Sequence, residues 1–161
     1  MEIIKCKNNF GKIVDLPKEK FQPRPSVYAI LRNGNFILTC RNKSNGKLWF
    51  PGGGVDEGES NEQALLRECL EETGITNIDI LKFLGDFRNY FYYEPEDLAM
   101  DAHLYFYECT TTEEKVKANE EVDDDESFDF KWVPIDQIAQ DDLADLNENI
   151  YNILKSLIKN S

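Results

Sequence analysis

The sequence predicts an α/β fold in which a mixed β-sheet is clasped by helices. Segments rich in aromatic and β-branched residues alternate with turn residues, which is typical of strands. A capped helical segment lies between these strands, and regularly spaced apolar residues near the C-terminus predict a second helix. At 161 residues the chain suits one compact domain, residues 1–161, with a core large enough to fold alone.

The composition is that of a globular protein with a strongly acidic balance. Hydrophobic residues make up 41% of the chain and charged residues 30%, and the formal net charge is -13. This charge argues against a surface that binds long nucleic acid or an anionic membrane. If the protein acts on an anionic substrate, we expect metal ions to neutralise the site.

The cysteines do not indicate a metal or a disulfide framework. Cys6, Cys40, Cys69 and Cys109 lie far apart without a CxxC pair, and His103 is the single histidine, so we expect no zinc site. The first ten residues lack the apolar core of a signal peptide, and no segment has a membrane-spanning length. These features predict buried thiols and a cytoplasmic location.

The strands of the first third follow from turn signals. Residues 8–11 predict a small hairpin, and residues 26–33 a strand. The Asn33-Gly34 pair then predicts a tight turn into a second strand over residues 35–41. Residues 47–54, KLWFPGGG, read as a short aromatic strand that runs into glycines.

The remaining elements follow from capping and periodicity. Ser60 with Gln63 fits a capping box and Gly74 a helix stop, which predicts a helix over residues 60–73. Further strands are expected at 80–93, 100–110 and 128–135, with a polar loop at 110–127, a short helix at 134–140 and a terminal helix at about 143–159. The apolar face of that last helix is formed by Leu143, Leu146, Ile150, Ile153, Leu154 and Leu157.

The first helix concentrates acidic residues. Glu68, Glu71 and Glu72 stand at i, i+3 and i+4, so their carboxylates share one face, and like charges at this spacing repel. A hard divalent cation reverses that cost because Mg²⁺ prefers carboxylate oxygens. Glutamate-rich helices are often only solvated surfaces, but the preceding glycines and Arg67 argue for a site. The opposite, packing side is expected to hold Leu65, Leu66, Cys69 and Leu70.

Residues 53–75 resemble the signature of the Nudix hydrolases, enzymes that cleave a nucleoside diphosphate linked to another moiety. The matching positions are Gly53, Glu59, Arg67, Glu68, Glu71, Glu72, Gly74 and Ile75. Cys69 departs from the usual aliphatic residue, but it lies on the packing side, where cysteine acts as a small hydrophobe. WFPGGG and KWVPIDQI extend the resemblance to about residues 25–140. It implies the Nudix α/β/α sandwich with a loop–helix–loop site.

The resemblance also implies a mechanism. Glu68, Glu71 and Glu72, helped by the Gly52 carbonyl, are expected to hold Mg²⁺ or Mn²⁺, so that a metal-activated water attacks a pyrophosphate. The expected catalytic residues are Arg67, Glu68 and Glu71, with Arg67 orienting Glu68, a candidate general base.

Further roles for acidic residues lie outside the metal-binding face. The resemblance implies that Glu59 supports the loop and, less directly, the metal shell. Glu126 is a candidate metal ligand or base from a later loop. Six of the seven residues 120–126 are acidic, so Glu126 is one of several possible acids in this loop. Most of these acids must be solvated.

Arg41 and Tyr92 are candidates for contact with substrate, whereas His103 is not. Arg41, at the end of a strand, could reach a phosphate or lie on the surface. Tyr92 stands where some dinucleoside polyphosphate hydrolases of the family carry a tyrosine, although alternate residues of such a strand simply pack. His103 reads as a partly exposed strand residue and not as a catalyst.

The substrate class stays open within the family. We expect a (d)NTP first, and a dinucleoside polyphosphate, ADP-ribose or a nucleotide sugar as alternatives. A nucleotide-binding sensor without catalysis is disfavoured by the complete set of charged residues, and an isopentenyl diphosphate isomerase by the single histidine. RNA decapping is disfavoured by the acidic charge. The resemblance leaves a homodimer open.

Overall fold

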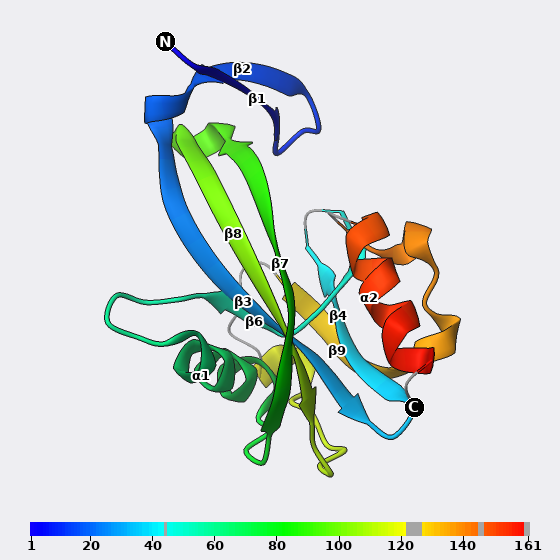
Figure 1. The fold of residues 1–161 in the computed structure, drawn as a ribbon. Helices are drawn as coiled ribbons and strands as arrows, with labels where there is room; N and C mark the ends of the chain where they lie inside the picture. The colour runs from blue at the N-terminus through cyan, green and yellow to red at the C-terminus, as the bar shows by residue number, and fades with distance from the viewer. Residues whose placement is uncertain (44, 122–126, 145–146, 160–161) are drawn as a thin grey trace.

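The computed structural model describes residues 1–43, 45–121, 127–144 and 147–159. Figure 1 shows helices α1 (Asn61–Thr73) and α2 (Asn147–Lys159) on opposite sides of one sheet. Within the described ranges, neither helix is long and apolar enough to cross a membrane. The strands are β1 (Ile3–Asn8), β2 (Ile13–Pro17), β3 (Phe21–Asn33), β4 (Phe36–Asn42), β5 (Leu48–Trp49), β6 (Gly52–Gly54), β7 (Asp79–Tyr93), β8 (Leu98–Thr110) and β9 (Ser127–Pro134).

The sheet is mixed, as the sequence predicted. The strand order is β2-β1-β7-β8-β3-β4-β5, with β6 pairing β3 and β9 pairing β4. β3 and β8 run parallel from Phe21↔Ala99 to Arg32↔Thr110, whereas β7 and β8 form an antiparallel hairpin. The short β6 therefore lies beside β3 and brings its three glycines to the sheet next to α1.

The β1–β2 hairpin extends the sheet at the end distant from α1 (Figure 1). Its turn is held by Asn8, whose Oδ1 accepts hydrogen bonds from the backbone N–H groups of Phe10 and Lys12. The hairpin joins the sheet through parallel pairing of Asn8 with Tyr92 on β7. The predicted hairpin at residues 8–11 is confirmed.

The tight turn between β3 and β4 is confirmed with a shift of one residue. Asn33 pairs with Phe36, so the turn residues are Gly34 and Asn35. Of these two, only Gly34 has a positive φ, at +60°. Glycine at the first central position suits a two-residue hairpin because it adopts this conformation without steric cost.

The core lies between the sheet and the two helices. Phe106 of β8 is fully buried and contacts Tyr28 of β3, Trp49 of β5 and Phe87 of β7. The buried residues of α1 include Leu65 and Cys69, and those of α2 are Ile150, Leu154 and Leu157.

The terminal helix begins later than predicted. Leu143 is not helical: it forms a parallel bridge with Leu48, and its neighbour Ala144 donates a hydrogen bond to the Leu48 carbonyl at 3.1 Å. This extended pairing buries Leu143 against the edge of the sheet and delays the helix to Asn147. Leu146 lies outside the described residues. The expected short helix at 134–140 is a 3₁₀ turn, Ile135–Gln137.

Candidate active site

Local interactions fix both ends of α1. Ser60 Oγ accepts from the Gln63 N–H at 3.1 Å, and the Gln63 side chain accepts from the Ser60 N–H at 2.9 Å, which completes the predicted capping box. At the other end Gly74 is left-handed, with φ +76°, and donates to the Leu70 carbonyl. The predicted helix is therefore confirmed with its boundaries.

The packing face of α1 differs from the predicted one. Leu65 and Cys69 are fully buried, as expected, but Leu66 and Leu70 are 42% and 47% exposed. The buried face of α1 is the one that carries Leu65, Cys69 and Glu72. Because successive helical residues rotate by about 100°, Leu66 and Leu70 point away from the sheet. Burial also raises the pKa of the Cys69 thiol, which agrees with its expected packing role.

The three clustered glutamates differ sharply in exposure. Glu72 is only 5% exposed and accepts a hydrogen bond from the Gly52 N–H at 2.9 Å. The side chain of Glu68 is 17% exposed, whereas that of Glu71 is 59% exposed. The sequence predicts the three carboxylates on the face opposite the packing side, and Glu72 departs from this prediction because it is buried against β6.

The glycines of β6 allow the sheet to approach these carboxylates. A Cβ added at Gly53 would lie 2.7 Å from the Glu68 carboxylate. A Cβ at Gly52 would lie 2.0 Å from the Val27 carbonyl oxygen, and Gly52 has φ +151°. Side chains at these two positions would therefore displace the backbone or the acid beside it.

Arg67 connects the helix to the loop before it. Its Nε and Nη2 donate to both carboxylate oxygens of Glu59 at 2.8 and 2.9 Å, and Nη1 donates to Glu68 Oε1 at 3.0 Å. Nη2 also donates to the Gly54 carbonyl at 3.0 Å. These hydrogen bonds from Arg67 lower the pKa of Glu59 to about 2, and Glu59 in turn raises the pKa of Arg67.

The ligand atoms that α1 offers are of the kind that a hard divalent cation prefers. Glu68, Glu71 and Glu72 offer carboxylate oxygens, and the Gly53 position is kept free for the Glu68 carboxylate. In the described part of the chain, no three histidine, cysteine or acidic side chains are already close enough to enclose an ion. Mg²⁺ does not require such a cage, because it usually binds through one or two carboxylates and retains several waters.

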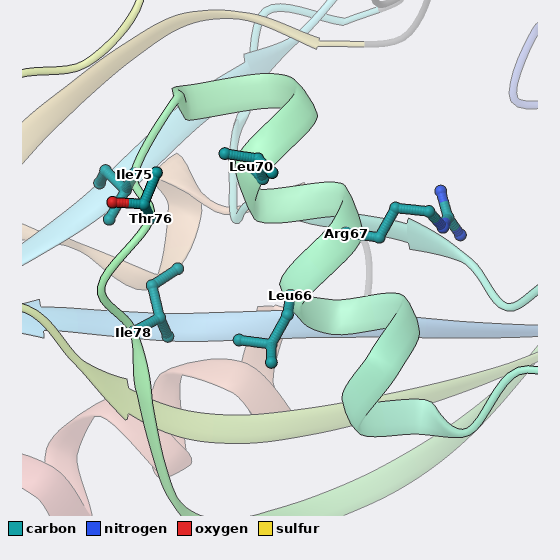
Figure 2. A pocket seen from close by; sticks show the side chains of 6 residues that line it. All are labelled: Leu66, Arg67, Leu70, Ile75, Thr76 and Ile78. Carbon is teal, nitrogen blue, oxygen red and sulfur yellow. The ribbon is translucent and has the colours of Figure 1, made fainter.

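A hollow on another side of α1 lies beside these residues. Figure 2 shows Leu66, Leu70, Ile75 and Ile78 around this hollow, of about 270 Å³, while Arg67 extends away from it. Its lining is apolar except for Thr76 and Arg67, so it does not belong to the carboxylate site.

Among the described residues, Arg41 and His103 have hydrogen-bond and ion-pair partners outside α1. Arg41 Nη1 donates to the Gly46 carbonyl at 2.7 Å, and its Nε lies 3.7 Å from Asp129 Oδ2. These contacts attach Arg41 to the loop after β4 and to β9. His103 lies 2.5 Å from Asp86 Oδ2 and stacks on Tyr105, on the partly exposed strand surface that was expected.

Tyr92 lies at the opposite end of β7 from α1. Its hydroxyl donates to Asp97 at 2.7 Å, and the Lys20 ammonium lies 5.3 Å from its ring centre. Gly53, which lies beside Glu68, pairs with Val27, and the register across β3, β8 and β7 puts it level with Asp86. Tyr92 lies six residues further along β7, which corresponds to about 20 Å of strand. The structure thus separates Tyr92 from the acidic site in this chain, and Glu126 lies outside the described residues.

Comparison with known proteins identifies the family. A family model described as the NUDIX domain matches residues 22–157. The chain belongs to the Nudix family. An RNA pyrophosphohydrolase of a Nitratiruptor species is 33% identical over 129 residues, which cover 72% of this Nudix chain and 81% of the relative. Other relatives of that name match over about half of their own length.

Solved structures share the fold. The MutT NUDIX hydrolase of Burkholderia pseudomallei superposes with a TM-score of 0.60 at 22% identity, covering 83% of this chain and 97% of that one. An ADP-ribose pyrophosphatase of Streptococcus suis gives 0.58 at 15% identity, covering 84% and 92%. The predicted Nudix α/β fold, family and enzyme class, a pyrophosphohydrolase, are confirmed.

Sequence reasoning missed one residue beside the site. Lys117 contacts the C-terminal end of α1 from a segment that the sequence described only as polar loop. No local pattern around Lys117 could have identified it, because its partners lie more than 40 positions earlier in the chain.

Proposed function

We propose that this Nudix enzyme hydrolyses a pyrophosphate bond in a nucleoside diphosphate-X compound with the help of Mg²⁺ or Mn²⁺, and that its first substrate class is a (d)NTP. The observation that carries the proposal is the connection of Arg67 to Glu59, Glu68 and Gly54 beside the buried Glu72. These hydrogen bonds hold the carboxylates beside β6. On an ordinary surface helix the same carboxylates would be solvated.

Each residue has a distinct task in this proposal. Glu68, Glu71 and Glu72, with the Gly52 carbonyl, would hold the ion, which when bound neutralises pyrophosphate oxygens and lowers the pKa of a water. Arg67 keeps one Glu68 oxygen engaged at 3.0 Å, which orients the carboxylate that would accept the proton. The Gly52 N–H fixes Glu72 in the same way at 2.9 Å.

The name of the relatives favours a second substrate class. The Nitratiruptor relative is an RNA pyrophosphohydrolase, which makes the 5′-triphosphate end of RNA the specific alternative to a free nucleotide. The net charge of -13 favours the free nucleotide, because a long RNA backbone would meet an acidic surface. Dinucleoside polyphosphates, ADP-ribose and nucleotide sugars stay in the set to be tested.

A release assay for phosphate and pyrophosphate tests the proposal. The panel holds standard and oxidised dNTPs, dinucleoside polyphosphates, ADP-ribose, nucleotide sugars and a short 5′-triphosphate RNA, with Mg²⁺ and then Mn²⁺. We expect turnover of one class to fall by orders of magnitude in Glu72→Gln and in Glu71→Gln, with both variants folded. Metal-dependent turnover that survives in these variants would remove the two residues from the site. If no compound is hydrolysed but nucleotides raise the melting temperature, the protein is a binding module.

A further inference from the structure

The last turn of α1 carries two of the proposed metal ligands, Glu71 and Glu72. Helix ends leave their final carbonyl groups without partners inside the helix, so this turn frays unless other groups bind them. Gly74 N–H donates to the Leu70 carbonyl, and Thr73 Oγ1 donates to the Cys69 carbonyl at 2.6 Å. The carbonyls of Glu71 and Thr73 need donors from elsewhere.

Lys117 supplies both of these donors. Its Nζ donates to the Glu71 carbonyl at 2.8 Å, and its backbone N–H donates to the Thr73 carbonyl at 2.9 Å. Its aliphatic stem crosses Gly74 closely enough that an added Cβ would lie 3.2 Å from Lys117 Cγ. The ammonium group also places a positive charge at the helix C-terminus, where the helix dipole favours a cation.

The segment that carries Lys117 is itself held in place. The Glu113 carboxylate accepts hydrogen bonds from the backbone N–H groups of Thr76 and Asn77, at 3.2 and 2.8 Å, and from Thr76 Oγ1. On the other side, Trp132 Nε1 of β9 donates to the Glu114 carbonyl at 2.9 Å. Contacts of the two residues Glu113 and Glu114 therefore hold the chain just before Lys117 next to the end of α1.

We propose that Lys117 is a positioning residue that keeps the last turn of α1 formed and so presents Glu71 and Glu72 ready for metal. The inference rests on the proposed function, since it assigns Lys117 a task toward the metal site. If the turn is formed only part of the time, the apparent metal affinity falls by that fraction. A turn formed for a fifth of the time would weaken binding about fivefold.

Two variants of neighbouring lysines test this inference. Lys117→Met removes the donor to Glu71, whereas Lys115→Met makes the same charge change at an exposed lysine that makes no hydrogen bond to α1 in the described residues. Mn²⁺ affinity is measured directly from the free ion by electron paramagnetic resonance, without substrate. Hydrogen exchange of the amides of residues 72–76 is measured in the metal-free protein.

We expect Lys117→Met to weaken Mn²⁺ binding about fivefold and to speed exchange in the last turn of α1, with Lys115→Met unchanged in both. In Lys117→Met, the Mg²⁺ concentration for half-maximal turnover should also rise. The nucleotide KM at saturating Mg²⁺ should stay constant. If Lys117→Met does not fold, Lys117→Gln, which is too short to reach Glu71, should give the same weakening.

The outcomes separate this inference from the function. Wild-type Mn²⁺ affinity in the folded Lys117 variants, with an active wild-type enzyme, overturns the positioning role and leaves the proposed function intact. A wild-type protein that binds no Mn²⁺ and hydrolyses nothing overturns both. Equal weakening in Lys115→Met also overturns the positioning role, because net charge alone would then explain the effect.

Discussion

Arg67 and Glu59 face each other in a two-point ion pair, with Nε and Nη2 of the guanidinium donating to the two carboxylate oxygens at 2.8 and 2.9 Å. The same guanidinium donates to Glu68 and to the Gly54 carbonyl. One side chain thus joins the loop before α1, the glycine strand β6 and a proposed metal ligand.

Arg67→Lys should lower turnover about 10- to 100-fold, because a lysine cannot reproduce the forked contacts that orient Glu68. Arg88→Lys is the matched control. Arg88 makes a similar two-point pair with Asp101, both contacts at 2.6 Å, but on an exposed strand surface away from α1. Steady-state kinetics should separate the two variants, and equal effects would show that Arg67 acts only on stability.

The pH dependence of stability should report the Glu59 pair. Arg67 lowers the folded-state pKa of Glu59 from 4.5 to about 2, so the carboxylate stabilises the fold fully above about pH 4.5 and loses that contribution as pH falls toward 2. Glu59→Gln should therefore be less stable than the wild type at pH 7, and the difference should shrink between pH 4.5 and 2.

Urea unfolding at several pH values measures this difference. Glu57→Gln serves as the control, since Glu57 is exposed and makes no hydrogen bond in the described residues. A gap between wild type and Glu59→Gln that stays constant down to pH 2.5 would mean that Arg67 does not lower the pKa of Glu59.

Gly53→Ala should reduce activity at least tenfold with little loss of stability. The new methyl group would lie 2.7 Å from the Glu68 carboxylate, and the flexible glutamate would move aside and lose its place. Gly54→Ala is the control, because no atom lies within 4 Å of its added Cβ. Kinetics together with melting temperatures test the pair, and full activity in Gly53→Ala would mean that Glu68 need not occupy its observed position.

The packing face of α1 can be tested by two neighbouring leucines. Leu65→Ala should destabilise the protein by about 2–5 kcal/mol, because it leaves a cavity in the core. Leu66→Ala should cost less than about 1 kcal/mol, since its side chain is 42% exposed beside the hollow in Figure 2. If both variants lose the same free energy of unfolding in chemical denaturation, Leu66 belongs to the packing face.

The sequence predicted α1 and its boundaries well because the signals are local. The Ser60–Gln63 capping box, the left-handed Gly74 and the spacing of the glutamates all depend on residues within about one helix length. The same holds for the β1–β2 hairpin and the turn at Gly34, where a single backbone conformation decides the element.

The tertiary structure alone decided how these local elements meet. The burial of Glu72 depends on Gly52, twenty positions away, and the cap on Glu71 depends on Lys117, forty-six positions away. Tyr92 was placed with the substrate by its distance along the chain, but β7 carries it to the β1–β2 hairpin. The spacing of Leu143 from the other apolar residues predicted a helix, but Leu143 forms a bridge with Leu48 instead. Helical periodicity fixes which side chains share a face, whereas contacts between distant segments determine which face is buried and what it touches.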